Sequence, residues 1–377
     1  MVFARWLILF IAVFNLFSLE LLAQESIKIP VVAPYTGSLA SFGEGVKNGA
    51  LLKAEEINAK GGINGKKLEI QLEDDLCEPK EASNVAARLA NDWKDVAIVV
   101  GHLCSSATLA ALPIYKKAEL VAITPASTNP TIGKSSGGYY FRNVYQDEFQ
   151  GAFLARYADE AMKWKKIVVF YETNDYSMGL KTAFVEEAKK RGLKLLGQEA
   201  YTSATTDFTP QLAKFKIMQP DAIFIPGYAP QGSLIINQAV KLGMKVHFLG
   251  ADGLDDAIML NNKNADGLLV TTPFLADAAG TAAKTFIDTY SKKFGKQPNW
   301  FAANTYDAVG IAAEAIAQAG SNRQKIKQHL AAINSPQKAY KGVTGNTYFD
   351  KNGDCLKPAF IKVIKDGQWV SAKKQLK

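Results

Sequence analysis

Two hydrophobic patterns alternate along most of the chain. Short apolar runs such as 96–100 are typical of buried parallel strands, and segments with apolar residues at helical spacing, such as 107–117, follow them. This alternation predicts an α/β protein with doubly wound sheets. The expected strands are 27–33, 68–74, 96–100, 120–123, 167–171, 194–201, 222–226, 246–250 and 267–272. The expected helices are 44–59, 79–92, 107–117, 150–162, 179–191, 209–216, 232–242, 281–294, 302–319 and 323–333.

Two of the predicted strand ends carry polar loops. Ser105 and Ser106 follow the strand 96–100 and are good N-cap residues for the next helix. The loop 124–128, TPAST, follows the strand 120–123, is rich in hydroxyl groups and has no helical pattern directly after it. Because the carboxyl ends of parallel strands meet at one sheet edge, and a helix start presents free N–H groups, we expect an anion to bind there.

The pattern changes near the carboxyl end of the chain. Residues 347–349, 359–364 and 368–371, separated by the turns 350–353 and 366–367, predict antiparallel hairpins. Asp350, Asn352 and Asp354 could suggest a calcium site, but the remaining ligands and the glycine position of that motif are missing. A hairpin turn is therefore the favoured interpretation.

The amino terminus has the features of a secretory signal peptide. Arg5 precedes an apolar run at 6–17, and the small residue Ala23 ends the segment. We expect cleavage after Ala23, so that residues 1–23 are removed. The alternative is a retained membrane anchor, but the run is shorter than the ~20 apolar residues that a span needs.

Composition places the mature chain among ordinary globular proteins. The full sequence of 377 residues, 48% hydrophobic and 21% charged, is enough for two domains. The formal charge of +8, from 44 Lys and Arg against 36 Asp and Glu, is spread along the chain without a dense basic block. We therefore expect no binding to nucleic acid, which favours clustered basic residues and a recognisable motif.

Three cysteines in an exported chain raise the question of a disulfide. Cys77 and Cys104 each follow a predicted strand of the same sheet, so they are the favoured pair, and Cys355 is left over. Pairing with Cys355, or three free thiols, remain the alternatives. His102 lies near a cysteine but the other two histidines are scattered, so we interpret all three as structural and expect no metal site.

An enzyme is the competing class of function. The segment 133–137, GKSSG, has the spacing of a nucleophile elbow, but no apolar strand leads into it and no helical pattern follows, so we expect a flexible loop. No phosphate-binding loop or zinc-protease motif is present, and unlinked histidines argue against a catalytic triad. The sequence thus favours a protein that is not an enzyme.

Several segments carry a resemblance to a known family. INAKGGINGKKLEI at 57–70, DDLC at 74–77, GHLCSS at 101–106, TPAST at 124–128 and FDKNGD at 349–354 resemble periplasmic binding proteins for branched-chain and related amino acids. The resemblance covers nearly the whole mature chain. It implies the type I periplasmic binding protein fold: two doubly wound Rossmann-like lobes joined by three crossing segments. Lobe 1 would comprise 24–143 and 275–357, and lobe 2 would comprise 144–274 and 358–377. The crossings would fall near 142–147, 272–275 and 357–360.

The resemblance also implies a set of ligand-binding residues. The ligand carboxylate would meet Ser105, the backbone of Ala126, and Thr128, while the ammonium would meet Asp252. The aromatic contacts would be Tyr176, Tyr228 and Phe42. Asp252 stands where the family usually has a longer glutamate and Phe42 where it usually has a tyrosine, so the particular ligand is left open.

Physical chemistry supports the same separation of a carboxylate-binding side from an ammonium-binding residue. A zwitterion taken out of water needs donors for its carboxylate and an anion for its ammonium, because an unpaired buried charge costs several kcal/mol. Two simpler roles stay open: Asp252 could cap its own loop, and Tyr176 and Tyr228 could simply pack under loops.

The resemblance implies a function and a location. The chain would be a monomeric periplasmic protein that captures an amino acid, of the hydrophobic or branched-chain kind, and delivers it to the permease of an ABC importer without any cofactor. Alternatives are an exported ligand sensor that signals to a membrane receptor, or a binder of amides or small aromatic acids.

Overall fold

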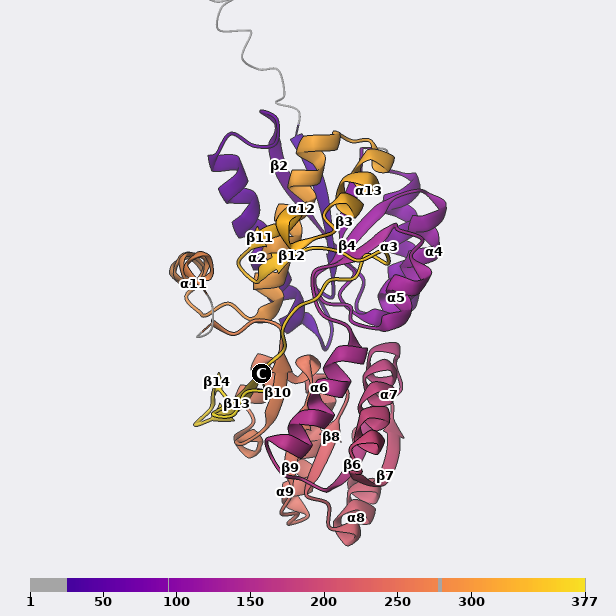
Figure 1. Ribbon diagram of the computed structural model, residues 1–377, viewed down its shortest axis with the longest axis vertical. Coiled ribbons are helices and arrows are strands. Elements are labelled where there is room, and N and C mark those ends of the chain that lie inside the picture. Colours follow the sequence, from indigo (N-terminus) through magenta and orange to yellow (C-terminus); the bar gives the residue numbers. More distant parts are fainter. Residues whose placement is uncertain (1–25, 94, 277–279, 377) are drawn as a thin grey trace, which may run out of the picture.

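The computed structural model describes residues 26–93, 95–276 and 280–376. The predicted signal peptide, residues 1–23, lies outside these ranges. Figure 1 shows two α/β lobes stacked along the long axis of the molecule. No helix in the described ranges is long and apolar enough to cross a membrane.

The first lobe is built on a parallel sheet. In the described chain its strands run in the order β2, β1, β3, β4, β5, and all neighbours pair in parallel. The strands are β1 (Ser26–Ala33), β2 (Lys67–Asp74), β3 (Ile98–Val100), β4 (Val121–Thr124) and β5 (Tyr140–Arg142). The helices are α2 (Ala40–Ala59), α3 (Pro79–Asn91), α4 (Ser105–Lys117), α5 (Pro130–Ser135), α11 (Thr281–Phe294), α12 (Trp300–Ala319) and α13 (Arg323–Ala332).

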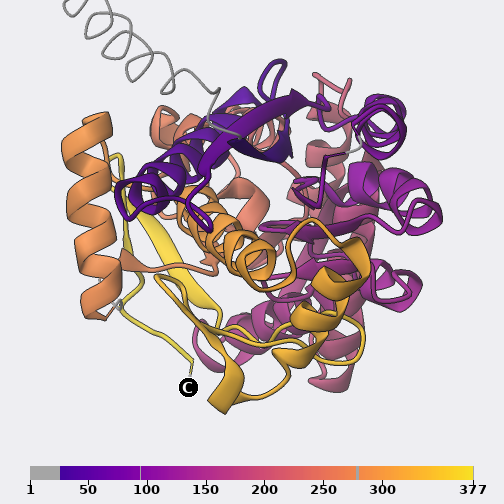
Figure 2. The same ribbon diagram turned by 90° about the horizontal axis from the view of Figure 1, so that it is seen from above.

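Helices cover both faces of this sheet, which explains its apolar strands. Val31 and Val32 are successive residues of β1, so their side chains point to opposite faces. Val31 belongs to the core that includes α2 and α12, whereas Val32 belongs to the core under α3 and α4. Figure 2 shows α11 at the rim of the lobe, outside α2 and α12.

The second lobe contains a mixed sheet. Among the described residues its strands run in the order β14, β13, β10, β9, β8, β6, β7, parallel from β7 to β10 and antiparallel beyond β10. The strands are β6 (Lys166–Glu172), β7 (Lys194–Tyr201), β8 (Ala222–Ile225), β9 (His247–Gly250), β10 (Leu269–Thr272), β13 (Phe360–Lys365) and β14 (Gln368–Ser371). The helices are α6 (Asp147–Glu160), α7 (Asp175–Lys190), α8 (Thr209–Met218), α9 (Ala229–Lys241) and α10 (Ala257–Leu260), with 3₁₀ turns η1 (Asp252–Leu254) and η2 (Lys263–Ala265).

The described chain passes between the two sheets three times. It crosses from β5 to α6, from β10 towards α11, and from the hairpin β11 (Tyr340–Gly342) and β12 (Gly345–Thr347) to β13. This architecture confirms the predicted fold class of two doubly wound lobes. The exact lobe boundaries, 24–143 with 275–357 and 144–274 with 358–377, stay a prediction.

Several local expectations were wrong. The segment after the TPAST loop is not a loop, because Pro130–Ser135 forms the short helix α5, in which Asn129 Oδ1 accepts from Thr131 N at 2.8 Å. The supposed flexible loop 133–137 therefore begins inside a helix. Ser105 is the first helical residue of α4 instead of its N-cap, a position that Cys104 occupies. The short strand β5, Tyr140–Arg142, was missed because three residues leave little periodicity to detect.

The carboxyl-terminal hairpins were only partly correct. The pairing of β13 with β14 is confirmed. Thr347, however, pairs with Tyr340 of β11, and β13 pairs with β10 on its other side. Strand β11 carries no long apolar run, so local pattern could not identify it. The turn at Asp350 is confirmed, with Asp350 Oδ1 accepting from Asn352 N at 2.8 Å.

Candidate ligand-binding site

Most of the residues predicted to bind ligand lie around one cavity between the lobes. Its lining includes Phe42, Ser105 and Ala126 from the first lobe and Tyr176, Tyr228 and Asp252 from the second. Thr128 is not part of that lining. The cavity measures only about 20 Å³, little more than one water molecule needs. The two sides of the cleft are therefore almost in contact.

Direct contacts across the cleft support this description. Asp175, in the second lobe, donates its N–H to Ser106 Oγ at 3.0 Å, and its carbonyl accepts from Asn129 Nδ2 at 2.6 Å. The Phe42 and Tyr228 rings meet edge to face with centroids 6.0 Å apart. The lobes are thus in a closed arrangement.

The two polar loops of the first lobe do converge, as predicted. Ser105 Oγ accepts from the backbone N–H of Asn129 at 3.2 Å, which joins the start of α4 to the loop after β4. The backbone N–H of Ala126 donates to Thr124 Oγ1 at 3.1 Å. A ligand carboxylate would therefore have to rely on groups other than this N–H.

Thr128 is buried in the same loop as Ala126, two residues further along the chain. Its hydroxyl makes no hydrogen bond of good geometry within the described ranges, although it lies near enough to the Asp147 carboxyl to lower the pKa of that group against the larger effect of burial, and its carbonyl accepts from Asp147 N at 3.0 Å. A buried hydroxyl without a partner carries a desolvation cost. It is therefore a group that a ligand could satisfy.

Asp252 supplies the acidic side of the cleft. It begins the turn η1 directly beyond β9, and only 2% of the residue is exposed. Its Oδ1 accepts from the Tyr176 hydroxyl at 2.6 Å, while its Oδ2 makes no hydrogen bond of good geometry in the described part of the chain, although the Gln150 and Tyr145 side chains lie near the carboxyl group. Burial raises the pKa of Asp252 to about 6, even though the Tyr176 hydroxyl acts to lower it.

Asp147 is a second buried acidic residue that the sequence did not point to, although it is not part of the cavity lining. It is the first residue of α6 and fully buried, and neither carboxylate oxygen makes a hydrogen bond of good geometry among the residues described, although the Thr128 hydroxyl and Arg142 lie near enough to lower its pKa against the larger effect of burial. Burial, followed by the charge of Asp252, raises the pKa of Asp147 well above its ordinary range. The only sequence signal was its position at the end of the first expected crossing, 142–147.

Aromatic rings form the remaining wall of the cavity. Tyr176 stacks on Tyr228 with centroids 5.3 Å apart, and Phe42 stacks on Phe301 at 4.5 Å. Trp300 stacks on Phe301 in turn, at 3.8 Å. Trp300 and Phe301 were not predicted, because they lie just before the expected helix 302–319 and resemble ordinary core residues.

The predicted disulfide is confirmed. Cys77 and Cys104 are joined, with their Cα atoms 5.5 Å apart, and Cys355 is free and buried. Burial raises the pKa of the Cys355 thiol to about 12. Cys104 lines the cavity and directly precedes Ser105, so the disulfide anchors the start of α4. No cluster of three potential metal ligands occurs among the described residues.

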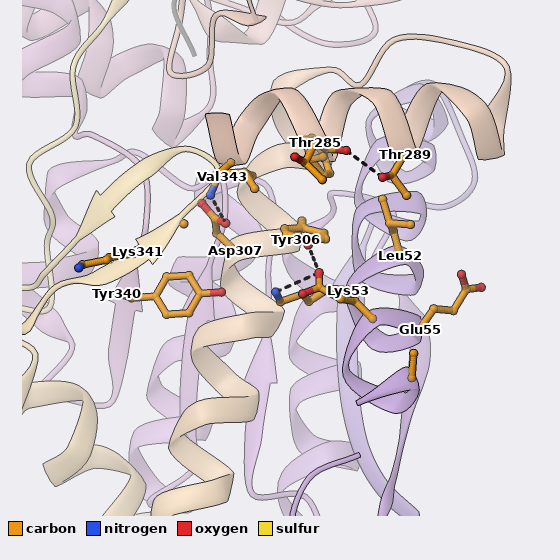
Figure 3. Close-up of a pocket in the computed structure, with 15 residues that line it drawn as sticks. Leu52, Lys53, Glu55, Thr285, Thr289, Tyr306, Asp307, Tyr340, Lys341 and Val343 are labelled. Atoms are coloured by element: carbon orange, nitrogen blue, oxygen red, sulfur yellow. Dashed lines mark hydrogen bonds and ion pairs between the residues drawn. The ribbon is translucent and has the colours of Figure 1, made fainter. Parts of the chain in front are cut away.

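A larger cavity, of about 630 Å³, lies outside the cleft between α2, α11, α12 and the β11 hairpin. Figure 3 shows Lys53 and Tyr306 side by side in it, and Lys53 Nζ lies 4.4 Å from the Tyr306 ring centroid. Although burial opposes the change, Lys60 and the Tyr306 hydroxyl lower the pKa of Glu56 to about 2. Asp307 Oδ1 accepts from Val343 N at 2.8 Å. These polar groups bind one another, and none of the predicted ligand-binding residues lines this cavity.

The closed cleft between two doubly wound lobes defines an α/β ligand-binding protein of the two-lobed kind. The chain belongs to the periplasmic binding protein family, whose model matches residues 26–368.

Two similar proteins are named as binding proteins for leucine, isoleucine and valine. The chain is 32% identical over 336 residues to a leucine-, isoleucine-, valine-, threonine- and alanine-binding protein of Pseudomonas aeruginosa, covering 88% of each chain. It is 33% identical over 332 residues to the Leu/Ile/Val-binding protein of Escherichia coli, again covering 88% of each.

A solved structure is similar over most of the chain. The branched-chain amino acid transporter substrate binding protein of Streptococcus pneumoniae, in complex with isoleucine, superposes with a TM-score of 0.87 at 32% identity. The match covers 93% of this chain and 99% of that one.

Proposed function

We propose that this protein captures a hydrophobic amino acid, of the branched-chain kind, between its lobes and delivers it to the permease of an ABC importer. The observation that carries the proposal is the placement of Asp252 opposite Ser105 across one cavity. The named relatives, which bind leucine, isoleucine and valine, support the same ligand class. The protein would act as a monomeric carrier without a cofactor and not as an enzyme.

Each side of the cleft would hold one end of the zwitterion. Ser105, Thr128 and the N–H groups at the start of α4 would bind the carboxylate, because a helix start favours negative charge. Asp252, assisted by Asp147, would bind the ammonium. Phe42, Tyr176 and Tyr228 would enclose the apolar side chain. A buried charge on the ligand would then have an opposite or donating group beside it.

Lobe movement follows from the size of the cavity. About 20 Å³ does not admit an amino acid, so the lobes would separate about the crossings near 142–147, 272–275 and 357–360 for entry and would close around a bound ligand less tightly than they do here. A ligand that contacts both lobes would favour their closure. The proposed location is the periplasm, after export and removal of residues 1–23.

A thermal-shift screen of the purified mature protein tests the proposal. The screen compares amino acids with amides and small aromatic acids, since a ligand of the native state raises the melting temperature. We expect leucine, isoleucine or valine to give the largest shifts and a smaller radius of gyration in solution scattering. Shifts given only by compounds without an ammonium group would refute the amino-acid assignment.

A further inference from the structure

A buried chain of three side chains lies behind the carboxylate side of the cleft. His102 Nδ1 lies 2.7 Å from Asp75 Oδ2, and His102 Nε2 lies 2.9 Å from the Tyr115 hydroxyl. All three residues are fully buried. Asp75 follows β2, His102 follows β3, and Tyr115 lies on α4. Both ring nitrogens of the histidine are thus engaged, and its orientation is fixed by two elements of the lobe.

The backbone around His102 is held equally firmly. The His102 carbonyl accepts from Thr124 Oγ1 at 2.6 Å and from Ser127 Oγ at 3.1 Å. Ser127 Oγ also reaches the Leu103 carbonyl, at 2.9 Å, and the Tyr140 hydroxyl donates to the Gly101 carbonyl at 2.5 Å. Three successive carbonyls are therefore bonded to side chains of the same lobe.

The three buried side chains are also connected to the disulfide. Asp75 Oδ1 accepts from the backbone N–H of Cys77 at 2.9 Å, and Cys77 is joined to Cys104. Cys104 directly precedes Ser105. Asp75 therefore restrains both ends of the segment 102–104, through the His102 ring at one end and through the disulfide at the other.

We propose that Asp75, His102 and Tyr115 are positioning residues that hold segment 102–105 in the geometry that receives the ligand carboxylate. None of the three lines the cavity, so they act through Ser105 and the start of α4. A preformed donor set binds more tightly because less conformational freedom is lost on binding. This inference rests on the proposed binding of an amino acid. It adds that affinity for the carboxylate depends on residues behind the site.

The test uses Tyr115→Phe, which removes one hydroxyl and keeps the ring, and Asp75→Asn, which keeps an acceptor for Cys77 N. Calorimetry of the mature protein measures L-leucine directly and L-leucinamide by competition, since the amide keeps the ammonium and side chain but lacks the carboxylate. We expect leucine affinity to fall roughly fivefold to tenfold in each variant, the size of one lost buried hydrogen bond. Leucinamide affinity should change less than about twofold.

Tyr139→Phe is the matched control, because it deletes a hydroxyl of the same lobe that accepts from Gln324 Nε2 at 2.9 Å, away from the cleft. It should leave both affinities unchanged. Hydrogen exchange should accelerate in segment 102–106 of the Tyr115→Phe protein while the rest of the lobe stays protected.

Three results would overturn the inference. Equal losses for leucine and leucinamide would mean that the whole cleft is damaged. A lower melting temperature with unchanged leucine affinity would leave these residues a purely structural role. A wild-type protein that binds none of leucine, isoleucine and valine would refute the proposed function itself, and the inference with it.

Discussion

On the first-lobe side of the cleft, hydrogen bonds hold the loops, whereas on the second-lobe side two buried carboxylates keep oxygens without hydrogen bonds of good geometry in the described structure. Ser105 Oγ and the His102 carbonyl are both bonded within the first lobe. Across the cleft, Asp252 Oδ2 and both oxygens of Asp147 make no hydrogen bond of good geometry in the described structure. One side is preorganised by its own contacts, and the other holds two buried carboxyl groups that its own side chains only partly satisfy.

The difference between the two sides of the cleft affects the free energy of charging the buried carboxyl groups. A carboxylate buried without a partner disfavours its charged form, and this is the reason that the pKa values of Asp252 and Asp147 are raised. An ammonium placed between them would relieve that cost. The first-lobe side would contribute fixed geometry, and the second-lobe side would contribute most of the dependence on ligand charge.

The largest expected effect is that of Asp252→Asn, which keeps the shape of the side chain and removes its charge. Leaving a ligand ammonium unpaired should cost about 2 to 5 kcal/mol, a thirtyfold or greater loss of leucine affinity by calorimetry. Asp207→Asn is the control, because Asp207 is a fully exposed carboxylate of the same lobe. If the Asp252 variant binds leucine as tightly as the wild type, the ammonium site lies elsewhere.

A smaller effect should appear with pH. Since the pKa of Asp252 is about 6, its protonation should reduce leucine affinity below that pH, by roughly tenfold for each further unit. Calorimetry between pH 5 and pH 8 would measure this. The raised pKa of Asp147 should act in the same direction. An affinity that stays flat from pH 8 to pH 5 would contradict a buried carboxylate partner.

The stability of the ligand-free protein should change with pH in the opposite direction to the leucine affinity. It should fall as the pH rises. The pKa of Asp252 in the folded chain, about 6, exceeds its ordinary value of 3.8. Its contribution to stability is therefore full below pH 3.8 and is lost as the pH rises through 6, a change of about 3 kcal/mol. The Asp252→Asn protein should lack this loss, so its stability relative to the wild type should rise between pH 4 and pH 7 in denaturant unfolding.

A smaller loss than that of Asp252→Asn is expected for Ser105→Ala on the preorganised side. It removes one hydroxyl, which also accepts from Asn129 N, but leaves the backbone donors of α4 in place. Leucine affinity should fall by about 1 to 2 kcal/mol. Ser83→Ala, on the exposed face of α3, should have no effect in the same titration. A loss as large as that of Asp252→Asn would remove the proposed asymmetry between the two sides.

Much of the fold could be predicted because the hydrophobic pattern of each long helix or strand lies within one continuous segment of the sequence. Helix α11 has the bounds that the pattern predicted, and most strands differ by one or two residues. Apolar periodicity over ten or more residues reports directly which face is buried. The short elements α5, β5 and β11 escaped because they contain too few residues for such a pattern.

The sequence by itself determined the alternating elements, the two polar loops and the favoured cysteine pair, because each depends on residues close together or on matched positions after strands. The tertiary structure alone decided the roles of Asp147 and Phe301 and the contact of His102 with Asp75 and Tyr115. Phe301 meets Phe42 only because α12 returns to pack on α2. Whether a buried polar or aromatic side chain finds a partner is set by such long-range packing, and no local pattern encodes it.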